Sequence, residues 1–222
     1  MNALDRPAWH ALRTRQKHLA QGEGRALRYR TDHALFAAAE DDGREALVAL
    51  AALIRTTGPA IQIEAGDPPL PPGVTAEKTR LGLQMLADSV APPERLPDFL
   101  DLGDADAPEM LALATLTEPG PFFANTHRLG GFIGIRERGR LVAMAGERMQ
   151  LTGYTEVSGV CTHPDFRGRG FAGTLMRIVA ARIIARGDRP FLHAYAENKG
   201  AIALYETLGF RPRSEMTVRF LA

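Results

Sequence analysis

A glycine-rich stretch, FRGRGFAGTL at residues 166–175, constrains this chain most, because it lies where an apolar strand pattern gives way to a helical one. It carries three glycines and two arginines. Glycine loses more conformational freedom on folding than any other residue, so its repeated use at one junction needs a physical reason. Either the turn is merely tight, or a partner must approach the backbone closely.

The residues after this turn predict a helix from about Gly168 to residue 186, ended by Gly187. A helix begins with N–H groups that have no partner within the helix, at the positive end of its dipole, and such a terminus binds anions. Gly168 and Gly170 have no side chain to keep a phosphate away. Arg167 and Arg169 add charge-assisted donors. The expected buried side consists of Leu175, Met176, Val179, Ile183 and Ile184.

Known phosphate motifs match this stretch only in part. A P-loop needs Lys followed by Ser or Thr after its last glycine, and Phe171 and Ala172 stand there instead. Gly168, Gly170 and Gly173 meet the G-x-G-x-x-G spacing of dinucleotide-binding folds. The surrounding pattern predicts hairpins, however, rather than the strand–helix–strand units of those folds. From the glycines alone, phosphate binding and a structural turn remain equally open.

The composition is that of a globular chain with a sizeable core. Of 222 residues, 45% are hydrophobic, and 27 basic side chains nearly balance 26 acidic ones. This size suits one large domain or two small ones. A formal net charge of +1 gives no reason to expect nucleic acid or an anionic membrane as a partner. No spacing of His, Cys, Asp and Glu predicts a metal site, so we expect no metal.

Cysteine usage and the N-terminus indicate a cellular location. The single cysteine excludes an internal disulfide and favours a reducing compartment. The first 22 residues are charged throughout, which is untypical of a secretory signal or a membrane span. The longest apolar run, at 46–54, is too short to cross a bilayer. We therefore expect a cytoplasmic protein.

A proline-rich segment at 90–97 divides the chain into two halves. In the first half, a helix is expected over the first twenty or so residues, and a second at 42–59, stopped by Gly58 and Pro59. Residues 66–73 are expected to be irregular. Strands are expected at 33–40, 60–66 and 78–88, with a helix as the alternative for the last.

In the second half, the sequence pattern of strands and helices is clearer. Residues 131–149 predict a hairpin that turns at Arg138 and Gly139, with its second strand central in a sheet. The long loop at 118–130 is a candidate binding loop. Asp106 is the expected N-cap of a helix. Further strands are expected at 98–103, 154–164, 190–195 and 214–220, and further helices at 106–116 and 198–209.

Two segments in this half resemble motifs of the GNAT superfamily of CoA-dependent N-acetyltransferases. VCTHPDFRGRGFAGTLM is similar to the family's acyl-CoA signature, Arg/Gln-x-x-Gly-x-Gly/Ala, at Arg167, Gly170 and Ala172. A strand that ends in x-Pro precedes that signature in the family, as Thr162-His163-Pro164 does here. The second match, NKGAIALYETLGF, has the family's residues at Asn198, Ala201, Tyr205, Gly209 and Phe210.

The resemblance implies the fold and the domain organisation. Residues 97–222 would form a GNAT domain of the α/β (α+β) class, with a mixed, mostly antiparallel sheet flanked by helices. Residues 1–96 would form a smaller, divergent N-terminal α/β domain, as in a subgroup of the family. A degenerate copy of the same fold is one possibility for that domain.

The resemblance also implies the cosubstrate, acetyl-CoA, and the residues that bind it. Gly159 is well placed for a bulge that splays the strand and exposes its backbone to the pantetheine arm. The cofactor-binding residues implied are Val160, Cys161 and Thr162 for the acetyl and pantetheine groups, Arg167, Gly168, Arg169, Gly170, Phe171 and Ala172 for the pyrophosphate, and Asn198 and Ala201 on the following helix. The alternative for Asn198 is that it only caps its helix.

Two residues are candidates for catalysis. The phenol of Tyr205 would be the acid for the departing thiolate, with an ordinary core position as the alternative. Glu156 would be a general base or would position a water. Its alternative is an edge carboxylate paired with an arginine such as Arg136 or Arg148.

Other polar residues near these motifs are weaker candidates. Cys161 should point away from Val160 and Thr162, so we expect its side chain to be buried among apolar groups. His163, beside a proline, is expected at the surface. In the loop at 118–130, Asn125 and His127 are expected to contact the acceptor or to form a lid.

The leading hypothesis is an acetyltransferase that transfers acetyl from acetyl-CoA to an amine by direct attack in a ternary complex. The acceptor would be a small molecule, a peptide N-terminus or a lysine. A non-catalytic acyl-CoA-binding or regulatory module is the alternative. An NAD-dependent oxidoreductase is a third hypothesis, which depends only on the spacing of the glycines.

Overall fold

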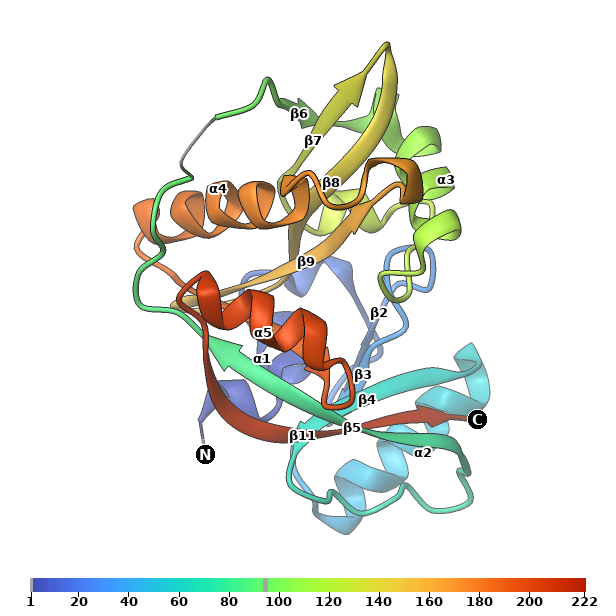
Figure 1. Ribbon diagram of the computed structural model, residues 1–222. Coiled ribbons are helices and arrows are strands. Elements are labelled where there is room, and N and C mark those ends of the chain that lie inside the picture. Colours follow the sequence, from blue (N-terminus) through green and yellow to red (C-terminus); the bar gives the residue numbers. More distant parts are fainter. Residues whose placement is uncertain (1, 94–95) are drawn as a thin grey trace.

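Strands from both halves of the chain combine in one eight-stranded sheet in the computed structural model, which describes residues 2–93 and 96–222 (Figure 1). Neighbouring strands are antiparallel except β9 and β10, which run parallel. The sheet order is β4 (Ala60–Ala65), β11 (Arg211–Leu221), β5 (Ala76–Leu86), β10 (Arg189–Tyr195), β9 (Tyr154–Thr162), β8 (Arg140–Leu151), β7 (Phe132–Glu137) and β6 (Leu100–Leu102). The mixed, mostly antiparallel sheet flanked by helices is the fold class expected from the sequence.

Helices cover both faces of this sheet. In Figure 1, α4 (Phe171–Ala185) and α5 (Lys199–Thr207) lie in front of it, and the N-terminal segment lies behind. That segment holds α1 (Pro7–Arg13) and a small three-stranded sheet. The remaining elements are β1 (Ala20–Gln21), β2 (Ala26–Tyr29), β3 (Ala37–Ala39), α2 (Arg44–Thr57), α3 (Ala107–Thr117) and short 3₁₀ turns at 3–5, 17–19, 104–106, 126–129 and 164–166.

Alternation along the strands creates a separate core on each face. Successive side chains of a strand point to opposite faces. In β10, Phe191 therefore packs with α1 and the small sheet, whereas Leu192 packs with α4. In β9, Val160 packs on the α4 side and Cys161 on the side of α3. The buried position expected for Cys161 is confirmed.

The sequence predicted most elements, with adjustments at their ends. The hairpin turn at Arg138 and Gly139 is confirmed, and β8 lies between β7 and β9. The segment at 78–88 is a strand as far as Leu86, not a helix, and only part of 33–40 is a strand. The first helix is short and flanked by 3₁₀ turns. Asp106 does precede α3, but its carboxylate accepts from the N–H of Gly103 and from Arg136 instead of capping the helix.

The glycine-rich turn leads into α4 at Phe171, three residues later than expected. Gly168 and Gly170 both have φ of +77°, which other residues rarely adopt. Four of the five predicted core residues of α4 are buried, whereas Ile184 is half-buried. Ile178 takes part in the core as well.

The first half of the chain is not limited to the small sheet. β4 and β5 precede residue 90 and yet are strands of the large sheet, where β5 lies between β10 and β11. Residues 94 and 95 of the proline-rich segment lie outside the described residues. The division between residues 96 and 97 stays a prediction. Within the described ranges, no helix combines the length and apolar character that crossing a membrane requires.

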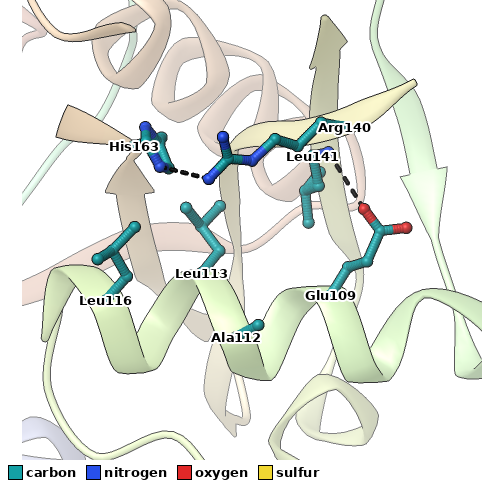
Figure 2. Close-up of a pocket in the computed structure, with 7 residues that line it drawn as sticks. All are labelled: Glu109, Ala112, Leu113, Leu116, Arg140, Leu141 and His163. Atoms are coloured by element: carbon teal, nitrogen blue, oxygen red, sulfur yellow. Dashed lines mark hydrogen bonds between the residues drawn. The ribbon is translucent and has the colours of Figure 1, made fainter. Parts of the chain in front are cut away.

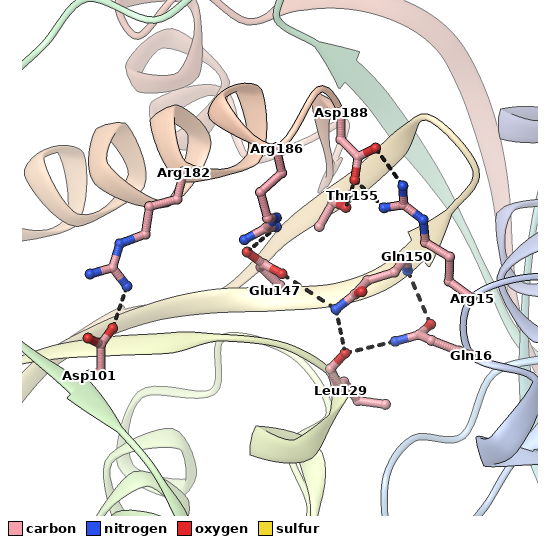
Figure 3. A network of polar contacts seen from close by, with 10 residues as sticks. All are labelled: Arg15, Gln16, Asp101, Leu129, Glu147, Gln150, Thr155, Arg182, Arg186 and Asp188. Carbon is pink, nitrogen blue, oxygen red and sulfur yellow. Dashed lines mark hydrogen bonds and ion pairs between the residues drawn. The ribbon is translucent and has the colours of Figure 1, made fainter.

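Buried polar contacts fasten the N-terminal segment to the sheet (Figure 3). Arg15 pairs with Asp188, which also accepts a hydrogen bond of 2.9 Å from Thr155. The side-chain amide of Gln16 donates to the carbonyl of Leu129 at 2.8 Å. Because Asp188 and Gln16 are almost completely buried, these contacts fix α1 and the small sheet against β8 and β9.

Candidate active site

The two parallel strands at the centre of the sheet part from each other. β9 and β10 pair only from Tyr154 with Arg189 to Glu156 with Phe191. Beyond that point, β10 continues along β5 and β9 continues along β8. The sheet therefore contains an opening in its middle, between the ends of β9 and β10, where backbone groups of β9 have no partner strand on that side.

A bulge in β9 accompanies this opening. Between Ser158 and Cys161 the strand has one residue more than its partner, which places the bulge at Gly159 and Val160. Gly159 has φ of +62°, and a Cβ there would lie 2.7 Å from the ring of Phe132. Only glycine fits such a position, so the bulge expected from the sequence is confirmed.

A second bulge, in β8, falls at Arg148 and Met149. Three steps on β8, from Glu147 to Gln150, oppose two steps on β9. Next to it, the Arg148 guanidinium binds the carboxylate of Glu156 through Nε at 2.8 Å and Nη2 at 2.6 Å. A bulge redirects side chains, and here it accompanies a bidentate ion pair beside the opening.

Glu156 is completely buried, and both oxygens of its carboxylate have hydrogen-bond partners. Besides Arg148, its carboxylate contacts Nδ1 of His193 at 2.7 Å and accepts from the N–H of Met149 at 3.3 Å. Burial opposes ionisation, but Arg148 and His193 outweigh it and lower the pKa of Glu156 to about 2. The carboxylate is therefore ionised at neutral pH and paired with an arginine, on a central strand rather than at an edge.

A cavity of about 320 Å³ lies at the opening. Its walls come from both faces of the sheet and from both halves of the chain. Tyr205 lines it, and burial raises the pKa of the phenol, so the proton stays on the oxygen at neutral pH. The other lining residues are Phe36, Ile61, Ile63, Thr117, Glu118, Pro119, Gly120, Pro121, Arg148, Val160, His193, Ala194, Tyr195, Asn198 and Val218.

A second cavity, of about 330 Å³, lies at the start of α4. It is lined by Thr162 and by every residue from Phe166 to Gly173, together with Leu204. A Cβ added at Gly168 or Gly170 would meet nothing within 4 Å, so the glycines leave open space there. Within the described part of the chain, no side chain caps α4.

The chemistry of this second cavity suits a phosphate-bearing ligand. The N–H groups of the first helical turn are aimed outward at the positive end of the helix dipole. Arg167 and Arg169 are exposed beside it, and the Arg169 guanidinium lies 4.8 Å from the ring of Phe166. The hydroxyl of Thr162 is buried without a hydrogen-bond partner among the described residues. An unsatisfied buried hydroxyl at the edge of an open cavity is suited to a ligand contact.

The start of α5 lies against the first cavity. The side chain of Asn198 accepts a hydrogen bond of 3.1 Å from the N–H of Ala201, so it caps the helix. Asn198 also lines the cavity, so capping and ligand contact are compatible. Ala201 is half-buried and lines neither cavity.

Three histidine and asparagine candidates lie elsewhere. Asn125 donates to the carboxylate of Asp32 at 2.8 Å, and His127 is buried against Asp104 at 2.7 Å. Neither lines the cavity, although Thr117 at the end of α3 and the first residues of their loop, 118–121, do. The surface position expected for His163 is wrong, because its ring is buried.

His163 lines a separate, smaller hollow of about 140 Å³ along α3 (Figure 2). Its Nε2 lies 2.5 Å from Arg140, and Glu109 accepts from the N–H of Leu141 at 3.2 Å. This hollow shares no lining residue with the cavities at the opening or at α4. It is therefore a structural feature of the α3 face.

The thiol of Cys161 is poorly suited to covalent chemistry. Burial raises its pKa to about 11, partly offset by Thr117, so it is protonated at neutral pH. Among the described residues, no group of three or more His, Cys, Asp or Glu side chains is arranged to hold a metal ion.

Sequence reasoning missed His193 and the wall from the first half of the chain. His193 is a polar residue within the apolar strand pattern of 190–195, and this was the one local signal of its role. Phe36 and Ile61 reach the cavity only because β4 joins the large sheet and the small sheet packs behind it.

The chain is similar to proteins of a known family. Residues 132–219 match the family described as FR47-like protein. A structure assigned to the GNAT family of acetyltransferases, from Novosphingobium aromaticivorans, has a TM-score of 0.92 and 44% identity, covering 100% of this chain and 99% of that one.

Two more distant structures share the fold. A GCN5-related N-acetyltransferase from Kribbella flavida has a TM-score of 0.70 and 19% identity, covering 99% and 96% of the two chains. A GCN5-related N-acetyltransferase-like protein from Streptococcus suis has a TM-score of 0.52 and 18% identity, covering 84% and 78%. No functionally curated protein matches the chain.

Proposed function

This chain belongs to the GNAT family of acetyltransferases, and on that premise we propose that it transfers the acetyl group of acetyl-CoA to an amine by direct attack in a ternary complex. The observation that carries the proposal is the opening between β9 and β10. One cavity at this opening adjoins Tyr205, and the other lies over the start of α4.

The residues of the second cavity fit the CoA part of the cosubstrate. The backbone N–H groups from Arg167 to Ala172 would hold the pyrophosphate, with Gly168 and Gly170 giving clearance. Backbone groups of Val160, Cys161 and Thr162 would hold the acetyl carbonyl and the pantetheine arm. When bound, acetyl-CoA supplies the thioester-activated acetyl group.

Tyr205 would provide the proton that the leaving sulfur needs. Its phenol lines the cavity, keeps its proton at neutral pH, and takes part in no hydrogen bond among the described residues. A proton held at that oxygen is available for transfer to the thiolate.

We place Glu156 in this proposal as a positioning residue. Its pKa of about 2 gives it little affinity for a proton at neutral pH, and it does not line the cavity. It holds Arg148 and His193, which do line the cavity, in fixed orientations. The proton of the amine would then leave by way of solvent.

The experiment that tests the proposal measures release of free CoA from acetyl-CoA in the presence of varied amines. Turnover that depends on an amine, with the N-acetyl product identified by mass spectrometry, would support it. Binding of CoA, seen as a raised Tm, without turnover of any amine would contradict it and favour a non-catalytic acyl-CoA-binding module.

A further inference from the structure

Arg148 presents unused hydrogen-bond donors to the cavity at the opening. Nε and Nη2 bind Glu156, whereas Nη1 takes part in none of the hydrogen bonds among the described residues. Arg148 lines the cavity, and Glu156 does not. The ring of Phe36, 4.6 Å away, supports the guanidinium from one side. The donor group is therefore held rigidly.

The imidazole of His193 is held between Gln84 and Glu156. Gln84 donates to the carbonyl of Leu4 at 3.0 Å and its own carbonyl accepts from Arg213 at 2.9 Å, which fixes the orientation of the amide. The amide nitrogen of Gln84 also lies 3.0 Å from Nε2 of His193, so that nitrogen accepts. Nδ1 then carries the proton that faces Glu156.

The remaining charge of the cavity wall is negative. Arg148 and Glu156 neutralise each other, which leaves the carboxylate of Glu118 at the exposed side of the wall. Glu118 takes part in no ion pair among the described residues. A cationic amine is favoured by this balance, and a ligand carboxylate would be uncompensated. The free donors of Arg148 therefore suit a neutral carbonyl oxygen.

Part of the wall, including the Phe36 ring beside Arg148, is apolar. It is lined by Phe36, Ile61, Ile63 and Val218, and by Pro119 and Pro121 of the loop at 118–130. With a volume of about 320 Å³, the cavity is at the lower end of the range for ligand sites. It suits a compact apolar side chain.

We infer that the acceptor is an α-amino amide with an apolar side chain. This inference depends on the proposed acetyltransferase function and specifies its substrate class. The amide oxygen accepts from Nη1 of Arg148, and the side chain packs against Phe36 and Ile61. The amine nitrogen forms a bond to the acetyl carbon as the carbon–sulfur bond breaks. The bound ammonium loses one proton to solvent before the attack, and the nitrogen loses a second after it. The sulfur gains a proton from Tyr205, and solvent then returns a proton to the phenolate.

The test compares wild-type kcat/KM for matched amines at saturating acetyl-CoA. Leucinamide carries all the predicted features; 3-methylbutylamine lacks the carbonyl, leucine has a carboxylate in its place, and glycinamide lacks the apolar side chain. We expect leucinamide to exceed each of the other three by roughly ten-fold or more. Equal or higher kcat/KM for any of the three would overturn the inference.

Failure of this inference is distinguishable from failure of the proposed function. If lysine peptides or polyamines are acetylated but leucinamide is not, the substrate class is wrong and the acetyltransferase activity stands. Leucyl-glycinamide distinguishes two kinds of acceptor that both carry an α-amino amide, a peptide N-terminus and a free amino amide. If kcat/KM for leucyl-glycinamide is well above that for leucinamide, the acceptor is a peptide N-terminus. If it is lower, the acceptor is a free amino amide.

Arg148→Lys tests the assigned donor while retaining a positive charge for Glu156. We expect the ratio of kcat/KM for leucinamide to kcat/KM for 3-methylbutylamine to fall to near one. An unchanged preference would overturn the role of Arg148. Should the variant not fold, wild-type protein with CoA gives a second measurement: N-acetyl-leucinamide should raise Tm more than N-(3-methylbutyl)acetamide, and equal shifts would contradict the inference.

Discussion

Arg148 and Glu156 face each other across β8 and β9 through two hydrogen bonds, of 2.8 and 2.6 Å, where the strands are no longer in regular register. Glu156 is completely buried and Arg148 nearly so. Arg148 lines the cavity and Glu156 lies in the core behind it, so the pair joins the core to the cavity wall.

Replacing Glu156 with Gln should strongly destabilise the fold. The variant leaves the Arg148 guanidinium buried without a counter-charge, and breaking a buried pair in this way costs about 3–5 kcal/mol. Urea unfolding monitored by circular dichroism measures the change. Glu118→Gln is the matched control, because Glu118 is exposed and should change stability by less than about 0.5 kcal/mol. Similar values for the two variants would show that the ion pair contributes little.

Tyr205→Phe should lower kcat by roughly 100-fold or more, the usual effect of removing a general acid, without weakening CoA binding. The phenol lines the cavity and its pKa is raised by burial, so the variant keeps the ring and loses the hydroxyl that carries the proton. Tyr195→Phe, on the same cavity, is the control and should retain most of kcat. Steady-state kinetics with CoA release as the signal distinguish them. Equal activity of both variants and the wild type would remove Tyr205 from the mechanism.

The features that sequence predicted best are those whose causes are local. Gly170 with φ of +77°, the turn at Arg138 and Gly139, and the bulge at Gly159 each depend on the conformation that glycine permits at one position. The apolar periodicity of α4 likewise needs only its own residues. Local rules therefore predicted the turn before α4 and the position of the bulge in β9.

The features that sequence could not predict depend on distant parts of the chain. His163 is buried because α3 and Arg140 cover it, and Phe36 reaches the cavity because the small sheet packs behind the large one. Asn125 faces Asp32, which is 93 residues earlier in the sequence. No periodicity or spacing near these residues carries that information.

Gly170→Ala should weaken CoA binding by more than its effect on stability explains. The added Cβ would meet no protein atom within 4 Å, so the cost in the folded protein comes from φ of +77° and is on the order of 1 kcal/mol. In the second cavity, however, the Cβ would occupy the space proposed for the pyrophosphate. Isothermal titration with CoA measures the loss, which we expect to be roughly ten-fold or more in Kd.

Gly187→Ala is the matched control for that variant. Gly187 follows α4 at its other end, with φ of +85° and no atom within 4 Å of an added Cβ. Its backbone cost should equal that of Gly170→Ala, while CoA binding stays unchanged. Equal effects of both variants on Kd would show that the start of α4 does not hold the ligand.

Stability should fall as pH rises through neutrality, because of Glu64. Burial raises the pKa of this carboxyl to about 7, despite Arg6, whose Nε lies 3.4 Å away. The folded protein therefore holds the proton more tightly than the unfolded chain, in which the pKa is about 4.5. The resulting stability is fully present below pH 4.5 and is lost progressively as pH rises through about 7.

Glu64→Gln isolates this effect, because the amide is neutral at every pH. The difference in unfolding free energy between variant and wild type should shift by up to about 3 kcal/mol in favour of the variant from pH 5 to pH 8, as measured by urea titrations. The exposed Glu45→Gln should instead follow the wild type across this range, because Glu45 is largely in solvent. If the difference in unfolding free energy between Glu64→Gln and the wild type does not change with pH, the carboxyl is ionised throughout this range. Arg6 then compensates fully for the burial of the carboxylate.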